Sequence, residues 1–346
     1  MDEALVLADN LSRRDFLKLS SFSLLGMGLP VYWRRDSFGL EQPRLGRVAD
    51  ATVDIFSRPD FASDKRKTLW RDDVLDLVGA ALGGSVPRHN RVWYEVDGLG
   101  FVHSSAIQPV ENELNSPLEF VPYQGRLMEL TVPFADAYWE PSKSAEKAYR
   151  FYYGSTHWIL GIKQDNAANK WYQIYDDKYT WRYYARAEAF RPIPQAELTP
   201  TSSRVPPHLK RIEIDLIQQR IRCFEDGDLV FSTKISSGRL LEDGTYWTPL
   251  GDFITFRKRG SRHMTYGNRA TGYDLPGVPW VCYITENGVA LHGTYWHNDY
   301  GTPRSHGCIN LTPEAAKWIY RWTLPVVPSD EQESWVSYGT KVEIIS

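Results

Sequence analysis

The chain has 346 residues, a formal net charge of −3 and a sequence pI near 6.3. Lys and Arg (40) nearly balance Asp and Glu (43), and no basic run occurs beyond the N-terminus, so no nucleic-acid partner is expected. The length allows two or three small domains. No hydrophobic stretch beyond the N-terminus is long enough to span a membrane.

The N-terminus carries Ser-Arg-Arg-Asp-Phe-Leu-Lys at 12–18, followed by a weakly apolar run over 19–31. The first segment resembles the twin-arginine export consensus, and the second suits a signal sequence better than a membrane span. We assign residues 1–40 to a twin-arginine signal; a basic amphipathic helix is the alternative. No Ala-x-Ala cleavage site is evident, so retention as an N-terminal membrane anchor stays open. The resemblance implies a twin-arginine translocase partner and a location in the periplasm or cell wall, at the outer face of the cytoplasmic membrane.

Two segments in the middle of the chain resemble each other. Trp-Tyr-Glu-Val at 93–96 and Trp-Tyr-Gln-Ile at 171–174 are each followed by a second strand-like run and a short Ala-containing turn. The pattern resembles the end of bacterial SH3-like domains, and an irregular β region is the alternative. We predict SH3-like modules over 45–111 and 118–195, joined by a Pro- and Ser-rich linker over 196–208 to the rest of the chain.

Aromatic residues make up 14% of the chain, and many lie in this middle region. Small barrels need large side chains to fill a short core, whereas aromatic faces also stack on sugar rings. We interpret these residues as core packing and keep glycan binding as the alternative.

Residues 209–346 have the pattern of a mostly β domain. Apolar and charged residues alternate over 211–216, which predicts a half-buried strand, and Glu-Asp-Gly-Asp at 225–228 predicts a hairpin turn. Further strands are expected over 279–284, 288–292 and 339–345. A helix is expected after Thr312, which is a good N-cap followed by a proline, with apolar residues along one face: Ala315, Trp318, Ile319 and Trp322.

The most informative stretch runs from His292 to Asn310 and contains Ser-His-Gly-Cys at 305–308. A cysteine is a good nucleophile only as thiolate, so a catalytic cysteine needs a nearby base and donors for the developing oxyanion. His292 is the candidate base for Cys308, and the turn at Gly307 is the candidate source of backbone donors. An ion pair of His292 with Cys308 is expected to lower the thiol pKa below its ordinary value near 8.5.

This pattern, a histidine followed about a dozen residues later by Ser-His-Gly-Cys-Ile-Asn, resembles the active-site signature of the L,D-transpeptidases of the YkuD family. Ser-Ser-Gly at 236–238 and Thr-Pro-Leu-Gly-Asp-Phe at 248–253 also resemble segments that precede the signature in that family. The resemblance extends over about 209–345. It implies a YkuD-type β-sandwich with short helices, so the expected chain is mostly β, with two small SH3-like β-barrels before the sandwich.

The resemblance also implies roles for individual residues. Cys308 and His292 are the catalytic pair, and the backbone carbonyl of Gly293 orients the base. The remaining residues of the loop have oxyanion or loop-holding roles: Ser305, His306, Gly307 and Asn310. No metal or organic cofactor is implied.

Plainer interpretations stay open for these residues. Cys308 could be a small buried hydrophobe and His292 a satisfied core histidine. A zinc site could join His292, His306 and Cys308 with His297 or Asp299, although no Cys-x-x-Cys pair supports it. The other two cysteines lie in apolar runs and are interpreted as core residues, with a disulfide between them as the alternative: Cys223 and Cys282.

The sequence therefore predicts an exported, cysteine-dependent L,D-transpeptidase that forms peptidoglycan cross-links through a thioester. Its expected partners are peptidoglycan stem peptides. Three alternatives remain: an L,D-carboxypeptidase that uses water, an enzyme whose acceptor is a protein lysine or a free D-amino acid, and a non-enzymatic cell-wall-binding protein.

Overall fold

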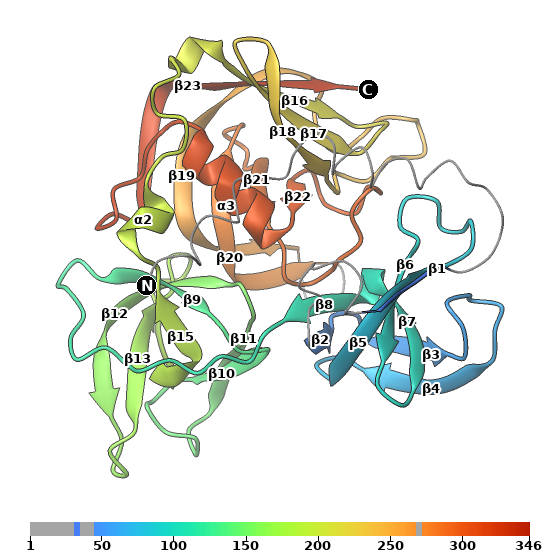
Figure 1. Ribbon diagram of the computed structural model, residues 1–346. Helices are drawn as coiled ribbons and strands as arrows, with labels where there is room; N and C mark the ends of the chain where they lie inside the picture. The colour runs from blue at the N-terminus through green and yellow to red at the C-terminus, as the bar shows by residue number, and fades with distance from the viewer. Residues whose placement is uncertain (1–30, 35–44, 268–271) are drawn as a thin grey trace, which may run out of the picture.

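The computed structural model describes residues 31–34, 45–267 and 272–346, which form three β-sheets and two short α-helices (Figure 1). The prediction of a mostly β chain, with two β-sheet regions before a C-terminal β domain, is confirmed. The twin-arginine segment at 12–18 lies outside the described residues. Strand β1 (Val31–Arg34) pairs antiparallel with β5 of the first sheet.

The first sheet has the strand order β4-β3-β7-β6-β5-β2-β8. The 3₁₀ turn η2 (Ser104–Ala106) connects β7 to β8 along the chain. The strands along the chain are β2 (Leu45–Val48), β3 (Thr52–Phe56), β4 (Lys65–Trp70), β5 (Val74–Leu82), β6 (Val92–Val96), β7 (Gly100–His103) and β8 (Ile107–Val110). We call these strands and their connections, residues 45–111, the first module.

The second sheet repeats this topology, with the order β11-β10-β14-β13-β12-β9-β15 and a matching 3₁₀ turn η3 (Ala187–Ala189). Its strands are β9 (Arg126–Leu130), β10 (Phe134–Tyr138), β11 (Lys147–Tyr152), β12 (Thr156–Gln164), β13 (Lys170–Tyr175), β14 (Arg182–Arg186) and β15 (Phe190–Pro192). The two Trp-Tyr strands, β6 and β13, hold equivalent central positions. The second module is residues 118–195; the SH3-like nature of both modules stays a prediction.

The third sheet is mixed, with the order β18-β17-β16-β23-β19-β20-β21-β22. It follows helix α2 (Gln195–Leu198) and the 3₁₀ turn η4 (Pro207–Leu209). Its strands are β16 (Lys210–Asp215), β17 (Arg220–Glu225), β18 (Asp228–Lys234), β19 (Gly251–Tyr266), β20 (Tyr273–Tyr283), β21 (Ala290–Gly293), β22 (Ile309–Leu311) and β23 (Glu333–Ile345). We call this part, residues 209–346, the C-terminal domain.

Helix α3 (Pro313–Trp322) directly follows β22 and begins where the sequence predicts. The Thr312 hydroxyl accepts a hydrogen bond from the Ala315 N–H at 3.2 Å, and so caps the helix. The buried face of α3 packs against β20 and β21, with Ile319 fully buried. Trp318 stacks on Phe231 with ring centroids 4.3 Å apart. The helix therefore fixes the end of β22, the strand that follows the Ser-His-Gly-Cys turn.

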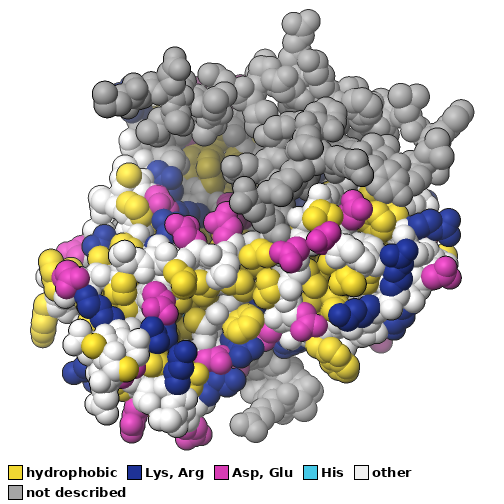
Figure 2. Space-filling view, turned by 60° about the horizontal axis from the view of Figure 1, so that its bottom comes forward, with side chains coloured by type: hydrophobic (Ala, Val, Ile, Leu, Met, Phe, Trp, Pro, Cys, Tyr) yellow, Lys and Arg dark blue, Asp and Glu magenta, His cyan; other side chains and the backbone are white. Residues whose placement is uncertain are grey.

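On the face drawn in Figure 2, Lys and Arg side chains are interspersed with Asp and Glu, and hydrophobic side chains lie between them. Within residues 45–267 and 272–346, no helix has the length and apolar character needed to cross a membrane.

Arg47 joins the two modules and the C-terminal domain. The residue is 1% exposed. Its guanidinium donates to Gln108 Oε1 at 2.7 Å and to the backbone carbonyl of Tyr295, in the C-terminal domain, at 2.6 Å. It forms an ion pair with Asp72 at 2.9 Å and lies 4.1 Å over the ring of Tyr152 of the second module. Because a buried cation is stable only when it is paired and hydrogen-bonded, this residue fixes the relative positions of the three parts.

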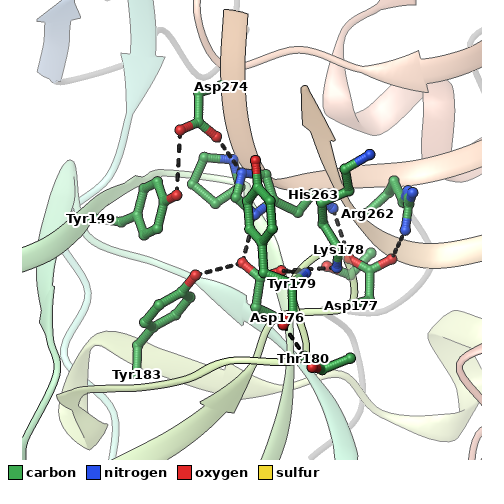
Figure 3. Close-up of polar contacts among 12 residues, drawn as sticks. Tyr149, Asp176, Asp177, Lys178, Tyr179, Thr180, Tyr183, Arg262, His263 and Asp274 are labelled. Atoms are coloured by element: carbon green, nitrogen blue, oxygen red, sulfur yellow. Dashed lines mark hydrogen bonds and ion pairs between the residues drawn. The ribbon is translucent and has the colours of Figure 1, made fainter. Parts of the chain in front are cut away.

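A second junction attaches the second module to the C-terminal domain through His263 of β19 (Figure 3). The imidazole is buried; Nδ1 bonds Asp176 at 2.5 Å, and Nε2 contacts Asp274. Tyr183 donates to Asp176 at 2.6 Å, and Tyr149 donates to Asp274 at 3.3 Å. Burial lowers the pKa of His263, but the two carboxylates outweigh burial and raise it above the ordinary value. The two carboxylates therefore favour the protonated form of His263 at this junction.

Replacing His263 with Gln removes this charge while keeping a hydrogen-bonding side chain. Because the pKa of His263 is raised, its stabilisation is fully present below the ordinary histidine pKa of about 6.5 and is lost as the pH rises through the raised value. We expect the wild-type free energy of unfolding to exceed that of His263→Gln by about 2–3 kcal/mol at about pH 5.5. By about pH 9 the difference should be smaller. Urea unfolding at both pH values measures it.

The matched control is His208→Gln, because His208 is exposed. It should unfold like the wild-type protein at both pH values. A difference between wild type and His263→Gln that stays constant or grows with pH would mean that the imidazole is neutral in the folded protein.

Candidate active site

Strand pairing brings the predicted catalytic pair to one face of the sheet. Strands β21 and β22 are parallel, with Leu291 opposite Ile309 and His292 opposite Asn310. Leu291 and Ile309 point into the main core. Because side chains alternate along a strand, His292 and Asn310 lie on the other face, together with Cys308 one residue before β22. His292 and Cys308 line the same cavity.

The turn before Cys308 is held by hydrogen bonds from the rest of the domain. Gly307 has φ +123°, which favours glycine. Its carbonyl accepts from Thr248 Oγ1 at 2.8 Å, and the same hydroxyl oxygen accepts from the N–H of Gly238 at 2.7 Å. Ser305 Oγ accepts from the Gly307 N–H at 3.1 Å and donates to the Cys308 carbonyl at 2.5 Å. The Ser-Ser-Gly and Thr-Pro segments therefore shape the turn directly.

This arrangement bears on the predicted oxyanion donors. The N–H of Gly307 is used by Ser305 in this structure. A role of this N–H toward an oxyanion therefore requires that Ser305 release it. Ser305 holds the loop, as the sequence predicts for it.

His292 has the orientation required of a base. Its Nδ1 donates to the Gly293 carbonyl at 3.0 Å, so the neutral imidazole carries its lone pair on Nε2. A Cβ on Gly293 would lie 2.8 Å from the ring of Pro279 and 3.0 Å from Pro313, so only glycine fits there. Burial without a charged partner lowers the pKa of His292 to about 4. The free site therefore holds a neutral imidazole.

The Cys308 thiol is also neutral in the free site. Burial raises its pKa to about 11, and an N–H donor from Ala290 only partly offsets that effect. The thiol lies 3.7 Å from the carbonyl of Gly288, and no hydrogen bond to His292 occurs among the described residues. The expected ion pair with a lowered thiol pKa is therefore wrong for the free site, because the same burial that encloses both groups penalises both charges.

His306 lies outside the strand pair, among aromatic rings. Its ring centroid is 4.8 Å from that of Trp247, 5.4 Å from Tyr266 and 5.5 Å from Tyr273. Burial, followed by the charge of Arg239, lowers its pKa. His306 lines the same cavity as Cys308, but an oxyanion role for it stays a prediction.

His297 is part of the site, although the sequence suggests only a polar loop residue. It is 4% exposed, and its Nδ1 accepts from the Asp299 N–H at 3.2 Å. Its Nε2 therefore carries the proton and faces the amide of Asn310 at 2.9 Å. The atom placed at this distance is Asn310 Nδ2, which is also a donor, while Asn310 Oδ1 is buried without a partner among the described residues. Turning the amide over puts Oδ1 toward Nε2 as the acceptor, and we assign that orientation. Burial lowers the pKa of His297 to about 3, so it acts as a neutral support for Asn310.

The cavity has a volume of about 320 Å³ and is lined by both the C-terminal domain and the first module. From the C-terminal domain come His292, Trp296, His306 and Cys308, and from the first module come residues around Asp50 and Arg71. The sequence could not assign the first-module residues, because nothing local links them to a motif more than two hundred positions later.

The other two cysteines belong to the core. Cys223 and Cys282 are free and buried, so they are core residues and no disulfide joins them. In the described part of the chain, no three His, Cys, Asp or Glu side chains are grouped so that they could hold a metal ion. The donor set that a zinc site at Cys308 needs is therefore not assembled there.

Comparison with known proteins identifies the C-terminal domain. Residues 209–344 match the YkuD family profile, described as the L,D-transpeptidase catalytic domain. The chain is 28% identical over 119 residues to the Bacillus subtilis (strain 168) protein named "Putative L,D-transpeptidase YciB", covering 32% of this chain and 58% of that protein. The resemblance stated from the sequence is confirmed for this domain. The family profile covers residues 209–344, about two fifths of the chain.

Solved structures of L,D-transpeptidases also resemble this chain. The catalytic domain of the E. faecium L,D-transpeptidase is 29% identical, with 39% of this chain and 96% of that chain covered and a TM-score of 0.30. The Ldtfm-avibactam carbamoyl enzyme is 28% identical, with 40% and 49% covered and a TM-score of 0.31. The L,D-transpeptidase from Mycobacterium smegmatis is 20% identical, with 53% and 80% covered and a TM-score of 0.33. The chain thus spans about half the length of some of these relatives.

The raised thiol pKa predicts how Cys308 reacts with iodoacetamide, which attacks only thiolate. In a Cys223→Ala/Cys282→Ala background, the alkylation rate of Cys308 should still be rising at pH 9, because the pKa is about 11. In His292→Ala this profile should keep its high midpoint, since the neutral imidazole does not set the thiol pKa. Turnover should nevertheless fall roughly 100- to 10,000-fold through loss of the base.

Glutathione, followed in the same buffers, calibrates the reagent. A plateau in the alkylation rate of Cys308 below pH 8.5 would show that the thiol is ionised in the free protein. If His292→Ala also lost that plateau, the result would support an ion pair between His292 and Cys308 in the free protein.

Proposed function

We propose that this chain is an exported cysteine-dependent L,D-transpeptidase that acts on peptidoglycan stem peptides. The observation that carries the proposal is the placement of Cys308 and His292 on one face of adjacent strands, at one cavity, within the segment that matches the L,D-transpeptidase catalytic domain. The Nδ1 contact to Gly293 supports it further, because that contact leaves Nε2 as the base.

The first step is acylation. Cys308 Sγ attacks the carbonyl carbon of an L-residue whose neighbour is a D-residue, while the thiol proton moves to His292 Nε2. The new carbon–sulfur bond forms as the carbon–nitrogen bond to the D-residue breaks. His292 then gives its proton to the leaving amine. Because both catalytic groups are neutral beforehand, proton transfer accompanies attack instead of preceding it.

The second step resolves the thioester. An acceptor amine from another stem peptide attacks the same carbonyl carbon, and His292 accepts a proton from that amine. The carbon–sulfur bond breaks, the proton returns to sulfur, and a new amide cross-link remains. Backbone N–H groups of the turn at Cys308 are the candidate donors to the oxyanion in both steps.

The test uses a short peptide that ends in an L-residue followed by a D-residue, together with an acceptor amine. Wild-type protein should release the terminal D-residue and give the cross-linked product, identified by mass. A carbapenem should add to the intact protein once, at Cys308. Both results should be abolished in Cys308→Ala.

The matched control is Cys223→Ala, which removes a cysteine from the core and should keep both reactions. Release of the D-residue with only hydrolysed product would identify an L,D-carboxypeptidase instead. A carbapenem adduct that survives Cys308→Ala, or no reaction with either reagent, would overturn the proposal.

The proposal includes export by the twin-arginine translocase, supported by the Ser-Arg-Arg-x-Phe-Leu-Lys segment at 12–18. Peptidoglycan lies outside the cytoplasmic membrane, so the export signal and the catalytic signature agree. Replacing Arg13 and Arg14 with Lys should keep the protein in the cytoplasm, because lysine lacks the planar guanidinium fork. Cell fractionation followed by immunodetection measures this, with Lys65→Arg as a distant control. Recovery of the double variant outside the membrane would contradict the export proposal.

A further inference from the structure

The wall of the active-site cavity opposite the catalytic strands belongs to the first module. Asp50 lies in the turn between β2 and β3, and the cavity that contains Cys308 includes Asp50, its neighbour Ala49, and Arg71. The backbone holds this turn on both sides. The Ala49 N–H donates to the Ala106 carbonyl at 2.8 Å, and the Arg71 N–H donates to the Ala51 carbonyl at 3.0 Å.

Asp50 is a carboxylate without a partner. It is half-buried, and among the described residues its side chain makes no hydrogen bond or ion pair. Burial raises its pKa, and the charge of Asp299 acts in the same direction, whereas Arg304 and Arg71 act against it. A partly desolvated carboxylate gains more than an exposed one from a cation that comes within hydrogen-bonding distance.

Among the described residues no cation forms an ion pair with Asp50, although the charges of Arg304 and Arg71 act on it. Arg304 forms its ion pair with Asp299 at 3.1 Å, and Arg239 donates from Nε to the Arg304 carbonyl at 3.4 Å. Asp299 is further occupied by His89 of the first module at 2.8 Å. The cavity therefore presents one unpaired carboxylate on the first-module side and guanidinium groups around it. This charge pattern fits a peptide that carries both an ammonium group and carboxylates.

The first module is fixed against the catalytic loop, so the position of Asp50 is defined. The N–H of Asn298 donates to the Ser105 carbonyl at 3.0 Å, and its amide donates to the Ser104 carbonyl at 3.2 Å. Arg47, three residues before Asp50, binds the Tyr295 carbonyl. A side chain held by a rigid support distinguishes ligands better than one on a mobile loop.

We infer that the first module forms one wall of the substrate site and that Asp50 selects peptides by binding a side-chain ammonium group. This inference rests on the proposed function, and it adds a specificity-determining residue from outside the catalytic domain. A peptide without the ammonium leaves the half-buried Asp50 carboxylate unpaired at the cavity wall, which weakens its binding.

The test measures binding without turnover. In Cys308→Ala protein, calorimetry compares two acetyl-blocked peptides that end in L-lysyl-D-alanine, one with a free side-chain amine and one with that amine acetylated. The free-amine peptide should bind about tenfold more tightly, the size expected for one partly buried charge-assisted contact. Adding Asp50→Asn should bring the ratio of the two dissociation constants close to one, mainly by weakening binding of the free amine.

The matched control is Asp76→Asn, which removes an exposed carboxylate from β5 of the same module and should keep the ratio. Asp50→Glu should keep part of the difference between the two dissociation constants, since glutamate keeps the negative charge. Equal binding of the two peptides by Cys308→Ala protein, or an unchanged ratio in Asp50→Asn, overturns the inference.

Failure of the inference is distinguishable from failure of the proposed function. If neither peptide binds while Cys308 in the unsubstituted protein still takes up one carbapenem, the inference is wrong and the proposed function stands. If Cys308 takes up no carbapenem and releases no D-residue, but the ratio depends on Asp50, the proposed chemistry is wrong and the ammonium site stands.

Discussion

The buried guanidinium of Arg47 is the interaction on which the arrangement of the three parts depends. Arg47 belongs to the first module, where its guanidinium forms an ion pair with Asp72. The same guanidinium lies over the ring of Tyr152 in the second module and donates to the Tyr295 carbonyl in the C-terminal domain. Breaking a buried pair of this kind costs about 3–5 kcal/mol, because a charge is left without compensation. One side chain therefore links the first module, which lines the cavity, to both the second module and the C-terminal domain.

Burial explains the protonation states of His292 and Cys308. Burial lowers the pKa of His292 to about 4 and raises that of Cys308 to about 11, so both groups are neutral before a substrate arrives. A neutral thiol is less open to oxidation and alkylation than a thiolate. In the proposed reaction the pair becomes charged only during attack, when donors aimed at the oxyanion can stabilise the developing charge.

The two modules show how one topology serves two roles. Their sheets have the same strand order, yet the first module lines the cavity and contacts the catalytic loop, whereas the second attaches through His263 between Asp176 and Asp274. The first contact places charges at the site. The contact of the second module is electrostatic, and its strength depends on whether His263 is protonated.

The sequence by itself determined what depends on neighbours along the chain. Thr312 and Pro313 start α3, the turn at 226–227 joins β17 to β18, and the spacing of His292 and Cys308 predicts the candidate catalytic pair. The repeated Trp-Tyr strands likewise indicated two related β regions before the catalytic domain. Only the tertiary structure decided which groups are buried together. The burial that shifts both catalytic pKa values, the support of Asn310 by His297 and the placement of Asp50 at the cavity all require contacts between distant segments, and desolvation and pairing depend on those contacts instead of on local sequence.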